Sequence, residues 1–86
     1  ERDVLELGYR VAAVREAIAN PAAPHALQAI TDLGRDQRYY VMVRGWLAYQ
    51  RQGDMSIVAA SSGQAPQHIR ERIRFLDRAI RAIDLE

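Results

Sequence analysis

The stretch that decides the fold is DMSIVAASSGQAPQHIRERIRFLDRAIR, residues 54–81. Apolar residues recur in it at spacings of three and four, as on one face of a helix, on both sides of a glycine–proline segment. Gly63 stands where a helix commonly ends in a left-handed conformation, and Pro66 suits a first helical turn, which needs no N–H there. The stretch therefore predicts a short helix, a tight turn and a longer helix.

Similar signals for helix ends and helix starts occur along the rest of the chain. Gly34 and Gly53 also follow apolar-periodic segments, and Asp36 and Asp54 precede others as candidate N-caps. No segment alternates as a strand does. The sequence predicts one all-α domain over residues 1–86, a compact bundle of about five helices whose long terminal helices pack on a central one. These helices are expected at 2–19, 23–33, 37–52, 55–62 and 66–84.

Both terminal helices carry a narrow apolar seam in which spacings of three and four alternate, as in coiled coils. Each helix is therefore expected to bury one stripe, either inside the bundle or against a second subunit. The seam residues are Val4, Leu7, Val11, Val14 and Ile18 in the first helix, and Ile69, Ile73, Leu76, Ile80 and Ile83 in the last.

The central helix is predicted to bury a wide apolar face, formed by Tyr39, Met42, Val43, Trp46 and Tyr49. Gly45 in its middle costs about 1 kcal/mol relative to alanine, so another helix is expected to approach closely there.

The other side of the central helix bears tyrosine and arginine, two residue types enriched at binding hot spots. This stripe is either a solvated face or a partner-binding surface. The binding hypothesis assigns it Tyr40, Arg44 and Arg51, with Arg38 nearby.

Composition limits the function classes. The 86 residues include no cysteine, which excludes disulfides, thiol catalysis and Cys-ligated zinc. The longest apolar run, residues 39–43, is far shorter than the ~20 residues of a membrane span, so no membrane partner and a cytoplasmic, soluble protein are expected. All twelve basic residues are arginine, yet the net charge is only +1 and the pI about 8.5, below the ~9 typical of dedicated nucleic-acid-binding domains.

Residues 55–76 resemble the helix-turn-helix of bacterial DNA-binding domains, through Ala59, Gly63, Ile69, Ile73 and Leu76. The resemblance implies that the helix over 66–76 reads DNA. The side chains that would then project toward bases and phosphates are those of Gln67, His68, Arg70 and Arg74.

Three positions depart from that pattern. Ser62 and Gln64 stand where the turn usually presents apolar side chains, and Arg72 occupies a site that many members keep apolar. The final helix is also long for a reader helix. These departures favour a corner of a helical bundle over a DNA reader.

Nothing in the sequence assembles a catalytic centre. The only histidines, His25 and His68, are far apart and have no ligand-spaced partner, and no phosphate loop or nucleophile–base pair is present. We therefore expect no enzyme activity, no catalytic residues, no cofactor and no metal.

These observations favour a non-catalytic helical module for protein–protein interaction or regulation. Its partner is expected to be another protein or a second copy of the chain, as a homodimer. The alternative is a helix-turn-helix transcriptional regulator that binds nucleic acid.

Overall fold

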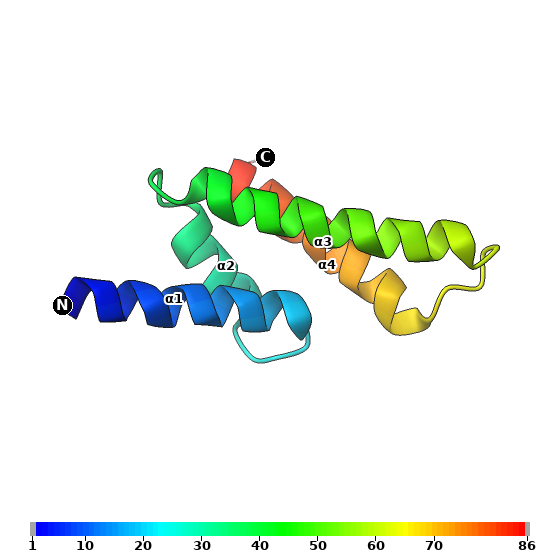
Figure 1. Ribbon diagram of the computed structural model, residues 1–86, viewed down its shortest axis with the longest axis horizontal. Coiled ribbons are helices and arrows are strands. Elements are labelled where there is room, and N and C mark those ends of the chain that lie inside the picture. The colour runs from blue at the N-terminus through cyan, green and yellow to red at the C-terminus, as the bar shows by residue number, and fades with distance from the viewer. Residues whose placement is uncertain (1, 86) are drawn as a thin grey trace.

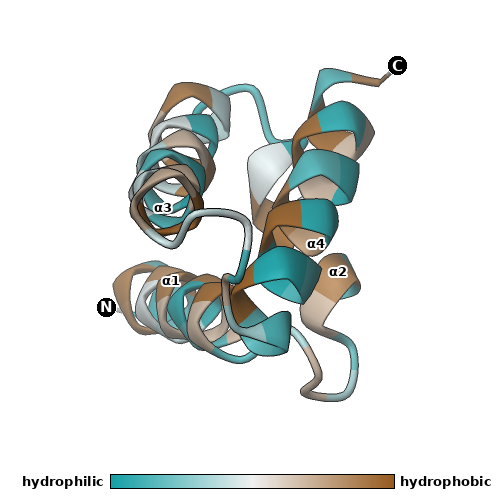
Figure 2. Cartoon of the chain, turned by 90° about the vertical axis from the view of Figure 1, so that its right-hand side faces the viewer, coloured by the Kyte–Doolittle hydropathy of each residue, from teal (hydrophilic) through white to brown (hydrophobic). Residues whose placement is uncertain are grey.

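The computed structural model describes residues 2–85, and in that range it contains four α-helices and no strand (Figure 1). The helices are α1 (Arg2–Ala19), α2 (Ala26–Gly34), α3 (Tyr40–Ala60) and α4 (Gln67–Asp84). Viewed end-on, α1 and α3 form one layer, and α2 and α4 form the other (Figure 2). The prediction of an all-α fold is confirmed.

The prediction of five helices is wrong, because the segments expected at 37–52 and 55–62 form one helix, α3. Gly53 does not adopt the left-handed conformation that would end a helix. Asp54 is not an N-cap either. Its side chain faces the core, where it accepts hydrogen bonds from Gln50 and Arg72, so the helix continues through it.

Two helix starts differ from the prediction by three residues each. His25, in the left-handed conformation, precedes α2, so the helix expected from residue 23 begins at Ala26. Asp36 accepts a hydrogen bond from the Arg38 N–H and thereby orders the turn before α3, which begins at Tyr40. Gly63, in contrast, is left-handed as predicted, with φ +80°.

The core lies mainly between α2, α3 and α4, with α1 closing one side. Its fully buried side chains include Val14, Ile30, Leu33, Val43, Leu47 and Leu76. α2 packs tightly at Gly34, where an added Cβ would lie 2.7 Å from Cγ2 of Ile83. The close approach expected at Gly45 is absent within residues 2–85, since nothing lies within 4 Å of a Cβ built there.

The buried face of α3 is narrower than predicted. Val43, Leu47 and Asp54 form its fully buried line, whereas Tyr49, expected in the core, is 82% exposed. Tyr49 lies two positions after Leu47, a rotation of about 200° around the helix, and therefore points away from the core.

The two terminal helices are not equivalent. α4 packs along α3 as predicted, but α1 packs chiefly against α2 and touches α3 only sparsely. Its seam is accordingly buried at Val14 and Ile18 and open at Val4. The molecule is elongated, 49 × 23 × 17 Å. None of its helices, within residues 2–85, is long and apolar enough to cross a bilayer.

Candidate functional site

Three ion pairs join α3 and α4 along their length. Arg44 pairs with Asp84 at 3.1 Å, Arg51 with Asp77 at 2.6 Å, and Asp54 with Arg72 at 2.8 Å. The residue numbers on α3 rise as those on α4 fall, so the two helices are antiparallel. The pairs fix both the register and the orientation of this hairpin.

The innermost pair is the most buried. The Asp54 side chain is fully buried and accepts two hydrogen bonds from the Arg72 guanidinium, at 2.8 and 2.9 Å, and a third from Gln50 at 3.0 Å. Burial raises the pKa of Asp54, but the hydrogen bonds from Arg72 and Gln50 outweigh it, so the pKa lies below its usual value. The site is a satisfied structural pair and has no free acid or base.

At the open end of the hairpin, Asp84 accepts hydrogen bonds from Arg44 and from the Tyr40 hydroxyl. The hydrogen bonds from Arg44 and Tyr40 lower the pKa of Asp84, and the same Asp84 contacts raise the pKa of both partners. Tyr40, Arg44 and Arg51, predicted to bind a partner, thus all have partners inside the chain. Their binding of another protein remains a prediction.

Arg44 and Arg51 also border a hollow of about 500 Å³ between α3 and α4. Its wall is mixed, with Asp77 beside the arginines and apolar side chains from both helices. The lining residues are Arg44, Ala48, Arg51, Gln52, Met55, Asp77 and Ile80.

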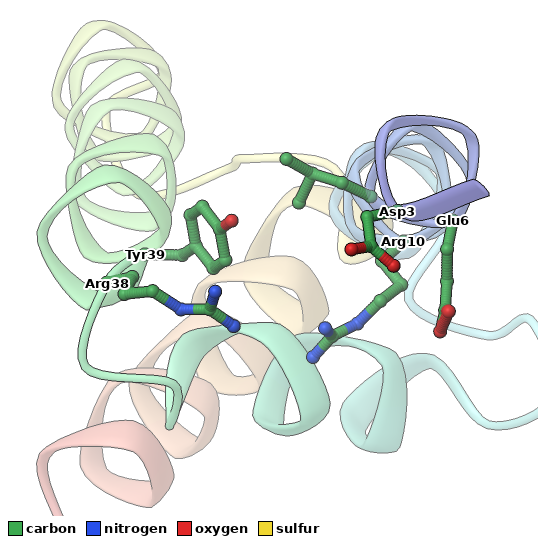
Figure 3. A pocket seen from close by; sticks show the side chains of 6 residues that line it. Asp3, Glu6, Arg10, Arg38 and Tyr39 are labelled. Atoms are coloured by element: carbon green, nitrogen blue, oxygen red, sulfur yellow. The ribbon is translucent and has the colours of Figure 1, made fainter. Parts of the chain in front are cut away.

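Arg38, the fourth predicted partner-binding residue, lies in a hollow of about 280 Å³ at the start of α3, opposite Arg10 of α1 (Figure 3). Arg38 pairs with Asp36 at 2.9 Å, and its side-chain and backbone hydrogen bonds lower the Asp36 pKa to about 2. Arg10 donates to the Asp32 carbonyl at 2.6 Å. Asp3 and Glu6 line the same hollow, so its charges are balanced and select neither cation nor anion.

A third hollow, of about 260 Å³, lies between α1 and α3 and has aromatic walls. Arg15 lies over the Trp46 ring, 5.6 Å from its centre, in a cation–π contact. Tyr49 and Ile18 complete the wall. Tryptophan, tyrosine and arginine are the residue types that most often dominate binding energy at protein interfaces.

The residues of α3 that are exposed away from α4 are uncharged, and the side chains of Arg44 and Arg51, 42% and 40% exposed, lie at the border with α4. The charged residues of this helix, Arg44, Arg51 and Asp54, all point toward α4. We call the exposed set the neutral face of α3; it comprises Val41, Gly45, Tyr49, Gln52, Gly53, Met55, Ser56, Ile57, Ala59 and Ala60. Because protein surfaces usually carry about a quarter to a third charged residues, a neutral face along 21 residues is unusual.

One side of the first half of α1, in the same layer, is also uncharged and exposed. Val4, Leu5 and Tyr9 are all more than 60% exposed, and Gly8 and Ala12 lie between them on the same side of the helix. Sequence reasoning assigned Val4 to a seam and overlooked Leu5 and Tyr9. Leu5 and Tyr9 lie on the side of α1 opposite the seam residues Leu7 and Val14 and therefore point away from the core.

The exposed side of α4 has the opposite character. Gln67, His68, Arg70 and Arg74, predicted to contact DNA, are all exposed. Arg78 and Arg81 extend the row, and none of the four exposed arginines forms an ion pair with residues 2–85. Within this row Gln67 donates to Glu71, and Arg70 donates to the Ala65 carbonyl. We call Arg70, Arg74, Arg78 and Arg81 the arginine row.

The two histidines lie apart, His25 before α2 and His68 in the first turn of α4, and both are exposed. Among residues 2–85, no three side chains of the metal-binding types come together as a cation site.

The chain matches no protein-family model, and no curated protein or solved structure is significantly similar to it. The function must therefore be argued from these surfaces alone.

Proposed function

We propose that the protein is a non-catalytic interaction module that binds a protein partner, either a different protein or a second copy of the chain, through the layer formed by α1 and α3. The observation that carries this proposal is the neutral face of α3, on which Val41 and Tyr49 are 79% and 82% exposed. Interface centres are depleted in charged residues, and this face carries none; it also exposes Tyr49, an aromatic residue of a type enriched at interfaces.

The intramolecular ion pairs support the same proposal. Each charged side chain of α3 forms an ion pair with a residue of α4, so these pairs hold the two helices together on one side of α3. The neutral face takes no part in these ion pairs. The aromatic hollow of Arg15, Trp46 and Tyr49 adjoins this face and offers a pocket for an anchoring side chain.

Site-specific photo-cross-linking in the native cell tests the docking surface. A benzophenone amino acid is placed at Tyr49 and, as matched controls, at Gln28 of α2 and Gln64 after α3, which are also exposed. We expect a discrete protein adduct from position 49 and none from positions 28 and 64. No adduct at 49, or equal adducts at all three positions, would contradict the proposal.

A second candidate function, nucleic-acid binding, is favoured by the arginine row on α4. Its four guanidiniums lie within one stripe of the helix, about 16 Å long from Arg70 to Arg81, with Glu71 as the one acidic neighbour that is exposed. Such a stripe can contact successive phosphates, and arginine can also bind guanine edges.

Titration of duplex DNA tests this second candidate. Binding should weaken steeply as salt increases, and the single substitutions Arg70→Ala and Arg74→Ala should each lower both the affinity and the salt slope. Arg2→Ala, on the exposed start of α1, is the charge-matched control. An absence of binding at about 50 mM salt would exclude this candidate.

A further inference from the structure

We propose that the partner covering the neutral face of α3 is a second copy of this chain, bound antiparallel about a twofold axis that crosses this face midway between Gly45 and Tyr49. This inference rests on the proposed docking function and names its partner. In such a pair, each Tyr49 lies against the partner helix at Gly45, because the two positions are one helical turn apart on the same face.

The total exposed area of the chain is large enough to accommodate a second copy as partner. The chain exposes 5950 Å², whereas a monomer of its mass, 9.7 kDa, is expected to expose about 5,100 Å². The elongated molecule therefore exposes about 800 Å² more than an average monomer of its mass, an area similar to what one partner buries in an interface of standard size.

The charge distribution favours a second copy over a charged partner. A twofold interface brings each surface against itself, so charged side chains near its centre meet charges of the same sign. The neutral face carries no charged side chain that would be repelled in this way, whereas the arginine rows of two copies would repel each other.

Gly45 also indicates that another helix packs on this face. A glycine inside an exposed helix costs about 1 kcal/mol relative to alanine, and residues 2–85 provide no neighbour within 4 Å to explain it. An external helix that packs closely at Gly45 provides the reason. Tyr49 of a second copy supplies a side chain of suitable size for the space.

Sedimentation equilibrium of the chain, across a concentration series, tests the inference. We expect a mass twice the 9.7 kDa of one chain. Gly45→Arg and Tyr49→Glu should each weaken the dimer by about a hundredfold or more, because each places two charges without partners in the interface. Gln28→Arg, exposed on α2, adds charge elsewhere and should leave the dimer unchanged.

Circular dichroism separates association from folding. Gly45 and Tyr49 are exposed and outside the core, so both variants should keep the helical signal of the wild type at high concentration. A wild type that stays monomeric, or folded Gly45→Arg and Tyr49→Glu variants that still dimerise fully, would overturn the inference. The photo-cross-linking experiment then decides about docking separately: an adduct of twice the chain mass agrees with a second copy, and an adduct of another mass supports docking while contradicting this partner.

Discussion

At the scale of single residues, Gly34 determines how closely α2 approaches α4. A methyl group at this position would lie 2.7 Å from Cγ2 of Ile83 and 3.1 Å from Cγ1 of Val43. Neither branched side chain can move without disturbing the core. We expect Gly34→Ala to lower the free energy of unfolding by about 1–3 kcal/mol, measured by urea denaturation. An unchanged midpoint would show that this helix approach is looser than described.

The buried pair of Asp54 and Arg72 is the second residue-scale dependence. Arg72→Ala leaves a buried carboxylate without its cation and should cost about 3–5 kcal/mol in unfolding free energy. The double variant Asp54→Leu/Arg72→Leu removes both charges and should recover most of that loss in the same denaturation experiment. If the double variant were as unstable as Arg72→Ala, packing rather than charge would account for the loss.

The carboxylates of the hairpin also predict how stability depends on pH. The pKa values of Asp54 and Asp84 are lower in the folded chain than in the unfolded one, so their ionised forms stabilise the fold. This contribution is complete above the unfolded pKa, near 3.8, and is lost as the pH falls through the lowered folded pKa values. Thermal melts between neutral pH and about pH 2 should show Tm falling below pH 4. The Asp54→Leu/Arg72→Leu variant should show a smaller fall, and an equal fall would assign the effect to other groups.

At the scale of elements, the continuity of α3 can be tested at Gly53. This residue is helical and exposed, with nothing within 4 Å of a Cβ built on it. Gly53→Ala should therefore raise the unfolding free energy by about 0.5–1 kcal/mol, seen as a higher Tm. If the chain turned at Gly53 in a left-handed conformation, as the sequence suggested, the same substitution would lower Tm instead.

The wrongly predicted break in α3 has a definite physical cause. The local sequence at Gly53 and Asp54 is typical of a helix end followed by an N-cap. Burial of Asp54 inside the helix is favourable only because Arg72 of α4 pairs with its carboxylate. Periodic apolar residues, in contrast, predicted α1 and α4 to within a residue of their bounds, because that signal does not depend on distant partners.

The candidate site was predictable only in part. The stripe of Tyr40, Arg44 and Arg51 was identified as chemically distinct, but its intramolecular partners Asp77 and Asp84 lie on a distant segment that the local pattern could not assign. The neutral face of α3 could have been found from the sequence. Between residues 40 and 60 only Arg44, Arg51 and Asp54 are charged, and a single helix would place all three on one side.

At the scale of the whole molecule, the two layers differ in chemistry. In the first layer α3 exposes the neutral face, and in the second layer α4 exposes the arginine row. A dimer formed through α3 would cover the first surface and leave the second free on both copies. Because the predicted interface lacks charge, the dissociation constant should change little with salt, whereas nucleic-acid binding by the arginine row should weaken steeply.

Cross-linking of single-cysteine variants shows whether the neutral face of α3 forms the interface. The chain has no cysteine, so Gly45→Cys on α3 and Arg74→Cys on α4 each provide the sole thiol for a short bis-maleimide reagent. If the dimer forms through the neutral face, covalent dimer should form rapidly from position 45 and hardly at all from position 74, at a concentration where the wild type is dimeric. Equal yields from the two positions, or a higher yield from α4, would contradict a dimer formed through this face.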